Sequence, residues 1–193
     1  MDKNLFIQRF HHLRLVRQED DFPLSKPGRP AAVLFPIVDR LEQLTVLFTR
    51  RSSHLKNHAG QVSFPGGKQE PDDEDLLATA LRETREEIGL ADAHIEVIGQ
   101  LPRFRTISYF EVVPYIGIVT PPFELTLDRN EVEEVFEVPL AYLLDMNNHH
   151  IQWFTRHGKQ RPVYFIPWND LHIWGATASF VRNLAYHFNE DIN

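Results

Sequence analysis

The segment from Asp73 to Gly89 has the pattern of an amphipathic α-helix, and it constrains the fold more than any other part of the sequence. Its side chains suited to a core recur at helical spacing and fall on one narrow stripe: Leu77, Leu81, Thr84 and Ile88. Asp72 or Asp73 can cap the start of this helix, and Gly89 can end it. The sequence therefore predicts a helix over residues 73–89 that packs against a hydrophobic core.

Three glutamates of this helix, Glu83, Glu86 and Glu87, are expected on the side opposite that stripe, because residues three and four apart are neighbours on a helix. Their mutual repulsion destabilises a helix by roughly a few tenths of a kcal/mol per pair, which a bound divalent cation would offset. The chain has no cysteine, so thiolate ligands are excluded, and a carboxylate site favours Mg²⁺ or Mn²⁺. Arg82, one turn before Glu86, can hold a carboxylate in position.

A helix with paired glutamates is more often a solvated surface helix, and the residues upstream decide between the two interpretations. Phe64-Pro65-Gly66-Gly67-Lys68 predicts a turn whose glycines let backbone groups approach a ligand closely. A glycine-rich turn that leads into an acidic helix supplies a backbone carbonyl as a further metal ligand, and amide groups for a phosphate. This combination favours a metal site over a purely solvated helix.

The charges of the chain are unevenly distributed. The net charge is −7, which argues against a general nucleic-acid binder, because such proteins usually carry a basic face. Residues 43–69 contain no acidic residue, whereas residues 70–87 contain eight acids and two arginines and so carry −6. A cationic block beside an anionic block is what a metal-assisted reaction on a phosphate needs, since one grips the phosphate and the other the metal.

The rest of the chain predicts short strands mixed with helices. Strands are expected at residues 31–38, 44–49, 61–64, 95–101, 109–119, 132–138 and 163–166. Further helices are expected at residues 5–16, 139–144 and 175–188, with a loop at residues 23–30. The 193 residues suit a single domain, with an N-terminal helix and linker over residues 1–30 and a core over about 31–188. The predicted fold class is α/β or α+β, a central mixed sheet flanked by helices.

The acidic helix and the residues before it resemble the Nudix box. The general pattern of that box is Gly, five residues, Glu, seven residues, and then Arg-Glu-apolar-x-Glu-Glu-x-Gly-apolar. In this chain Gly67 and Glu74 precede Arg82-Glu83-Thr84-Arg85-Glu86-Glu87-Ile88-Gly89-Leu90. Six residues rather than five separate Gly67 from Glu74, which leaves the role of Glu74 open, and Thr84 takes an apolar position. The resemblance implies an α/β/α sandwich and a metal-dependent hydrolase.

The residues upstream resemble the coenzyme A pyrophosphatase branch of this family, which shares the lengthened box. The residues that mark the branch follow one another here as Arg51-Ser52, Leu55, Lys56, His58-Ala59-Gly60-Gln61-Val62 and Phe64-Pro65-Gly66-Gly67. Residues 130–140 and 173–178 resemble later segments of the branch, so that the likeness covers about residues 30–188. It implies hydrolysis of the diphosphate in coenzyme A or its thioesters to 3′,5′-ADP and 4′-phosphopantetheine or its acylated form.

The expected metal ligands are the carbonyl of Gly66 and the carboxylates of Glu83, Glu86 and Glu87. Glu131 could approach the metal from a loop as ligand or general base, while Glu83 competes for the role of base. Glu131 could equally be a surface acid without a role. The number of metal ions stays open.

Substrate contacts are expected from the residues between the second predicted strand and the helix. Arg51 and Lys56 are candidates for the 3′-phosphate, because coenzyme A carries one more dianionic group than ordinary dinucleotides. His58 could add a hydrogen bond or only anchor the loop, and the amide of Gly67 could face a phosphate.

Two other functions remain open. One is a Nudix hydrolase of ADP-ribose or nucleoside triphosphates; the other is a non-catalytic sensor, which would be expected to lose box carboxylates that this chain keeps. The N-terminus has no signal-peptide pattern, and no apolar run approaches the roughly 20 residues of a membrane span, so a cytoplasmic protein with a small-molecule substrate is expected. The oligomeric state is open, a homodimer included.

Overall fold

The computed structural model describes residues 1–12, 19, 26–156 and 158–188. The helices are α1 (Lys3–His12), α2 (Leu76–Ile88), α3 (Leu140–Leu144) and α4 (Gly175–Phe188), with two short 3-10 helices, η1 (Asp92–His94) and η2 (Met146–Asn148). The strands are β1 (Arg29–Asp39), β2 (Leu44–Arg51), β3 (Val62–Ser63), β4 (Gly66–Lys68), β5 (Ile95–Gln100), β6 (Phe104–Arg105), β7 (Phe110–Val119), β8 (Val132–Pro139), β9 (His150–Arg156), β10 (Lys159–Trp168) and β11 (Leu171–Trp174). No helix among these residues is long and apolar enough to cross a membrane.

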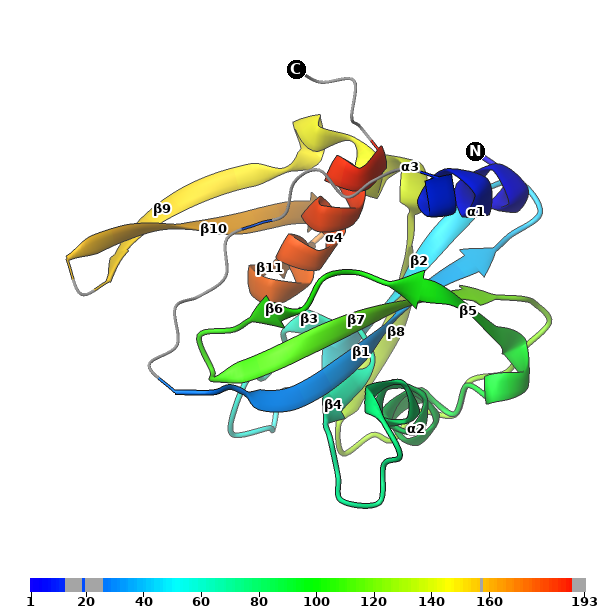
Figure 1. Ribbon diagram of the computed structural model, residues 1–193, viewed down its shortest axis with the longest axis horizontal. Coiled ribbons are helices and arrows are strands. Elements are labelled where there is room, and N and C mark those ends of the chain that lie inside the picture. Colours follow the sequence, from blue (N-terminus) through cyan, green and yellow to red (C-terminus); the bar gives the residue numbers. More distant parts are fainter. Residues whose placement is uncertain (13–18, 20–25, 157, 189–193) are drawn as a thin grey trace.

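A mixed sheet forms the centre of the molecule. In the described residues it has eight strands, with the order β3-β2-β1-β7-β5 and with β8 on β2, β4 on β1 and β6 on β7. The pair β1–β7 is parallel, and the other pairs of this sheet are antiparallel. Helix α2 lies on one side of the sheet, and α1 and α4 lie on the other (Figure 1). The predicted fold class, a central mixed sheet flanked by helices, is confirmed.

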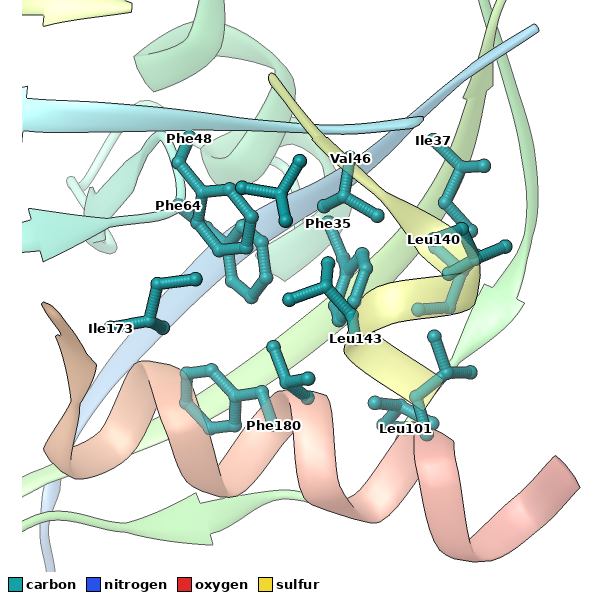
Figure 2. Packing of buried hydrophobic residues seen from close by; sticks show 14 of the residues in the cluster. Phe35, Ile37, Val46, Phe48, Phe64, Leu101, Leu140, Leu143, Ile173 and Phe180 are labelled. Carbon is teal, nitrogen blue, oxygen red and sulfur yellow. The ribbon is translucent and has the colours of Figure 1, made fainter. Parts of the chain in front are cut away.

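The alternation of side chains along β2 separates two hydrophobic cores. Leu47 packs with Ile88 of α2 in the smaller core, and Phe48 packs in the larger core on the other side of the sheet. The ring centroids of Phe48 and Phe64 are 4.8 Å apart. Figure 2 shows Phe180 of α4 directed toward these rings. Phe48 therefore lies on the side of the sheet that faces α4, and its neighbour Leu47 lies on the side that faces α2.

A second sheet, β11-β10-β9, is antiparallel, and its β9–β10 hairpin projects away from the main sheet (Figure 1). Only residues 163–166 of it were predicted as a strand. Strands β9 and β11 were missed because their mixed polar and aromatic residues lack a clean alternation.

Several predicted boundaries are wrong. Helix α2 begins at Leu76 rather than at residue 73, and strand β1 begins at Arg29, inside the predicted loop. The predicted turn at residues 64–68 contains β4, which pairs with Ala31–Val33 of β1. The predicted helix at residues 5–16 is α1, and positions 13–16 of that prediction lie outside the described residues, as do 23–25 of the loop.

Candidate active site

The start of α2 is capped by Asp75, whose side chain accepts a hydrogen bond from the amide of Ala78 at 2.7 Å. The prediction of Asp72 or Asp73 as the cap is therefore wrong. Asp73 is instead bound in the loop before the helix, where it accepts from the amide of Glu70 at 2.9 Å. Gly89 ends the helix in a left-handed conformation, as predicted.

Arg82 connects this loop to the glutamates of α2. Its Nε and Nη2 atoms donate to the two carboxylate oxygens of Asp73 at 2.8 and 3.0 Å. Its Nη1 atom donates to Glu83 at 3.0 Å and to Glu86 at 2.9 Å. The paired guanidinium holds the pKa of Asp73 well below its usual range. Arg82 thus holds Glu86, as the sequence predicts, and it also contacts Glu83, which was not predicted; Asp73 in turn fixes Arg82.

Glu87 is the most buried of the three glutamates. Its side chain is 5% exposed, whereas that of Glu86 is 60% exposed. The prediction that all three lie opposite the core stripe is therefore wrong for Glu87, because β1 and β4 cover that side of α2. Burial raises the pKa of Glu87 to about 8, against the opposing effects of Arg51 and of the amide of Gly66.

Two groups upstream of α2 approach the Glu87 carboxylate. The amide of Gly66 donates to its Oε2 at 3.2 Å, and Nη1 of Arg51 lies 3.8 Å from its Oε1. A Cβ on Gly66 would overlap the backbone of Ala32 and Val33, and its φ of +153° also favours glycine. The strand pairing of β4 thus requires glycine here.

Glu83 lies against the second glycine of β4. A Cβ on Gly67 would overlap its carboxylate oxygens, so the glycine makes room for this side chain. Burial raises the pKa of Glu83, and nearby Glu86 and Glu131 add to the rise. Because the charge of Glu131 also raises the pKa of Glu87, the acids of α2 and the turn before β8 belong to one electrostatic cluster. We call Glu83, Glu86, Glu87 and Glu131 the carboxylate cluster.

The loop at residues 52–61 is anchored to the turn that carries Glu131. The amide of Ser52 donates to the carbonyl of Glu131 at 2.8 Å, and its hydroxyl donates to the carbonyl of Arg129 at 3.0 Å. Ser52 is buried, and no role was predicted for this residue beyond its place in the upstream motif. The loop therefore connects β2 to the carboxylate cluster.

Of the residues predicted to bind substrate, Arg51 lies against Glu87, whereas Lys56 and His58 lie exposed on this loop. Nδ1 of His58 is 2.7 Å from Oε1 of Gln61, a contact that anchors the loop. The structure thus brings Arg51 to the carboxylate cluster, and it places Lys56 and His58 farther along the loop.

Known proteins resemble this chain over most of its length. The family model described as NUDIX domain matches residues 28–157. The chain is 41% identical over 162 residues to the Nudix hydrolase NudL of Photorhabdus laumondii subsp. laumondii, covering 84% of this chain and 86% of that protein. It is also 41% identical over 161 residues to NudL of Yersinia pestis, covering 83% and 80%. The chain belongs to the Nudix hydrolase family.

Solved structures share the Nudix fold at lower identity. A MutT/nudix family protein from Enterococcus faecalis matches with a TM-score of 0.51 and 18% identity, covering 100% of this chain and 70% of that one. The Nudix hydrolase RenU of M. smegmatis matches with a TM-score of 0.50 and 18% identity, covering 59% and 72%. Members of the family act on phosphorus anhydrides in small-molecule diphosphates, and they generally use divalent metal ions.

The structure explains the lengthened Nudix box. Five residues separate Gly67 from Asp73, as in the general pattern, and Asp73 is the acid that pairs with Arg82. Seven residues separate Glu74 from Arg82, but Glu74 is exposed. The extra residue therefore lies between Asp73 and Arg82, and Asp73 is a site residue that counting from Gly67 could have found.

The carboxylates of Glu83, Glu86 and Glu87 are the type of ligand that a hard divalent cation prefers. Glu83 and Glu87 are both held in surroundings that raise the pKa, so a nearby cation would stabilise their ionised forms. Among residues 1–12, 19, 26–156 and 158–188, however, no three acidic or histidine side chains are already arranged around one metal position. Arg82 takes up one oxygen each of Glu83 and Glu86 in this conformation.

Proposed function

We propose that this Nudix protein hydrolyses the diphosphate bond of coenzyme A or its thioesters, with Mg²⁺ or Mn²⁺ as cofactor. The observation that carries the proposal is the buried Glu87 carboxylate, which meets Arg51 from the upstream motif and Gly66 from the glycine turn. Residues that resemble the coenzyme A branch are thus in direct contact with the Nudix box. A buried carboxylate with a pKa of about 8 lowers the stability of the folded protein when it is ionised, and such groups are concentrated at functional sites.

Glu83, Glu86 and Glu87 would hold the cation, with the carbonyl of Gly66 as a further ligand. When bound, the cation polarises the phosphoryl oxygens and offsets the charge that develops during attack by water. Arg82 restricts the positions of Glu83 and Glu86, and the Gly66 amide restricts that of Glu87. These contacts supply the preorganisation on which phosphoryl transfer depends.

Two residues compete for the role of general base. Burial raises the pKa of Glu83, which brings its proton affinity closer to the neutral pH at which a general base works best. Glu131 is the alternative, since it is exposed on the turn before β8 and its charge acts on Glu83 and Glu87. Either carboxylate would take the proton of the attacking water.

Coenzyme A as substrate is supported by the 52–61 loop. Ser52 fixes the start of this loop to the turn that carries Glu131. The upstream motif, with its cationic residues and glycines, therefore begins beside the carboxylate cluster. Lys56 is exposed on the loop and is our candidate for the 3′-phosphate. Arg51, at 3.8 Å from Glu87, is better placed for the diphosphate than for the 3′-phosphate.

The test is a substrate panel with resolved products. The protein is incubated with Mg²⁺ and coenzyme A, dephospho-coenzyme A, ADP-ribose or dATP, and the products are separated by chromatography. We expect coenzyme A to be consumed fastest and to yield 3′,5′-ADP and 4′-phosphopantetheine. Much faster consumption of ADP-ribose or dATP would show that the substrate assignment is wrong, and no hydrolysis of any of them would favour a sensor.

Dephospho-coenzyme A is the matched control for the 3′-phosphate. Replacing Lys56 by alanine should lower kcat/KM for coenzyme A by about tenfold and leave that for dephospho-coenzyme A unchanged, because only the former carries the extra dianion. An equal loss on both substrates would contradict this role for Lys56.

A further inference from the structure

A pocket of about 490 Å³ lies at the end of β2, between the 52–61 loop and β11. This volume is in the range of small-molecule sites. Its walls combine apolar side chains (Val62, Leu171 and Trp174) with polar ones (Arg50, Glu133 and Asp170). Strand β11 contacts β3 beside this loop. None of these residues belongs to the carboxylate cluster.

The charges of the pocket disfavour a phosphate. Nη2 of Arg50 lies 2.8 Å from Glu133 and 3.5 Å from Glu134, so its positive charge is already balanced by two carboxylates. Asp170 adds a further negative charge to the lining. Acidic side chains outnumber Arg50 around the pocket, which His172 also lines, so a phosphorylated group is disfavoured here. An uncharged group with amide or hydroxyl hydrogens would find carboxylate acceptors.

Exposed aromatic side chains lie next to the pocket on one face of the second sheet, among polar residues such as His150 and Gln152. Trp174 is 39% exposed, and its ring stacks on Phe165 with centroids 6.2 Å apart. Phe154 is exposed on the same face of that sheet as Phe165. It pairs with Arg161, and the side chains of Arg161 and Phe165, four positions apart on β10, point to the same face.

The pocket and the carboxylate cluster lie on opposite faces of the main sheet, both beside the end of β2. Arg50 lines the pocket, and the next residue, Arg51, contacts Glu87. Consecutive Cα atoms are only about 3.8 Å apart. Strands β3 and β8 pair with β2 on both sides of Arg50, so a flexible ligand with its diphosphate at the cluster would reach the pocket around the end of β2, past the 52–61 loop.

We propose that this pocket binds the uncharged, amide-bearing arm of the substrate, with Trp174, Leu171 and Val62 packing on its apolar groups and Asp170 accepting from its amides. The inference rests on the proposed function, because coenzyme A has a phosphorylated nucleoside on one side of its diphosphate and an uncharged pantetheine arm on the other. The negative lining selects the uncharged half.

Two variants test the pocket in complementary ways. Trp174→Ala removes a wall, and Ser53→Trp fills the pocket from an exposed loop position without altering the core. Trp153→Ala is the matched control, since Trp153 is 62% exposed on the opposite face of the second sheet. The readouts are the affinities of 4′-phosphopantetheine and 3′,5′-ADP by calorimetry, and the kinetics with coenzyme A.

We expect both pocket variants to bind 4′-phosphopantetheine about tenfold more weakly and to bind 3′,5′-ADP within about twofold of the unaltered protein. KM for coenzyme A should rise about tenfold at nearly constant kcat, and Trp153→Ala should change neither. Selective loss of 3′,5′-ADP would overturn the inference by assigning the pocket to the nucleotide half.

Failure of this inference differs from failure of the proposed function. If the unaltered protein hydrolyses coenzyme A but the pocket variants keep its KM and their affinity for 4′-phosphopantetheine, the pocket assignment is wrong and the function stands. If the unaltered protein does not hydrolyse coenzyme A, the function fails, and the pocket assignment fails with it.

Discussion

The two sides of the sheet at the end of β2 are built in different ways. On the α2 side, polar groups from residues 51–87 meet: Glu87 contacts Arg51 and the amide of Gly66, and Arg82 pairs with Glu83. On the other side, the pocket is assembled from residues as distant in sequence as Arg50 and Trp174, and part of its wall is apolar. The comparison suggests that the first side performs the chemistry and the second side selects the substrate.

The difference predicts which kinetic constant each side controls. Groups that act on the reacting diphosphate should change kcat, because their contacts strengthen in the transition state. Groups that hold a distant part of the substrate should change KM instead. Substitutions on the α2 side therefore test whether its groups control kcat rather than KM.

The largest effect is expected from Glu86→Gln. Loss of one carboxylate ligand should reduce kcat at least about 100-fold, and the circular dichroism spectrum and melting temperature should stay close to those of the unaltered protein, since Glu86 is exposed. Glu74→Gln removes the same charge from an exposed position just before the helix and should change kcat by less than about twofold. Equal effects of the two substitutions would show that the carboxylates of this side are not specialised.

Asp73→Asn should lower stability rather than remove a reacting group. The substitution weakens the paired hydrogen bonds with Arg82, and we expect a loss on the order of 2 kcal/mol in the free energy of unfolding at pH 7, measured in urea. Asp72→Asn, at an exposed position, should cost less than about 0.5 kcal/mol.

The same pair of variants has a defined pH dependence. The pKa of Asp73 is held below its ordinary value, so its contribution is present above pH 4 or so and is lost as the pH falls through the folded-state pKa. The difference between Asp73→Asn and the unaltered protein should therefore shrink in acid. A difference that stays constant down to pH 2 would contradict the ion pair.

Glu87→Gln is expected to have a smaller effect, with the opposite dependence on pH. Burial raises the pKa of Glu87 from 4.5 to about 8 in the folded, metal-free protein. Below pH 4.5 the carboxyl is protonated in both the folded and the unfolded state and does not lower stability. As the pH rises from 4.5 to about 8, the carboxyl ionises only in the unfolded state, so the free energy of unfolding falls. The glutamine variant lacks this titration. In EDTA it should be more stable than the unaltered protein at pH 8 by on the order of 1 kcal/mol, with little difference at pH 5. Parallel stability curves from pH 5 to 9 would count against a buried, titrating carboxylate.

Local spacing accounts for the part of the site that could be predicted from the sequence. The helix, its three glutamates and the contact of Arg82 with Glu86 all depend on neighbours within one or two turns. The burial of Glu87 could not be read in the same way, because it depends on how β1 and β4 pack on α2. Helical periodicity alone does not say how wide the covered face is.

The fold shows the same division. The long strands β1, β2 and β7 were predicted from apolar runs, and the parallel pairing of β1 with β7 could not be, since it joins residues about 80 positions apart. The three-residue β4 has two glycines, and its sequence indicates a turn; only its pairing with β1 makes it a strand. The pocket was missed for the same reason, because β11 and the end of β2 meet only in the folded chain.

The most direct test of the carboxylate cluster as a metal site is a calorimetric titration of Mn²⁺ into the unaltered protein, Glu86→Gln and Glu74→Gln, with hydrolysis of coenzyme A followed in parallel. We expect Mn²⁺ to bind the unaltered protein and Glu74→Gln equally, to bind Glu86→Gln at least about tenfold more weakly, and to restore the activity that EDTA removes. Equal Mn²⁺ affinity in all three proteins, or full activity in EDTA, would contradict the proposal that these glutamates hold the catalytic metal.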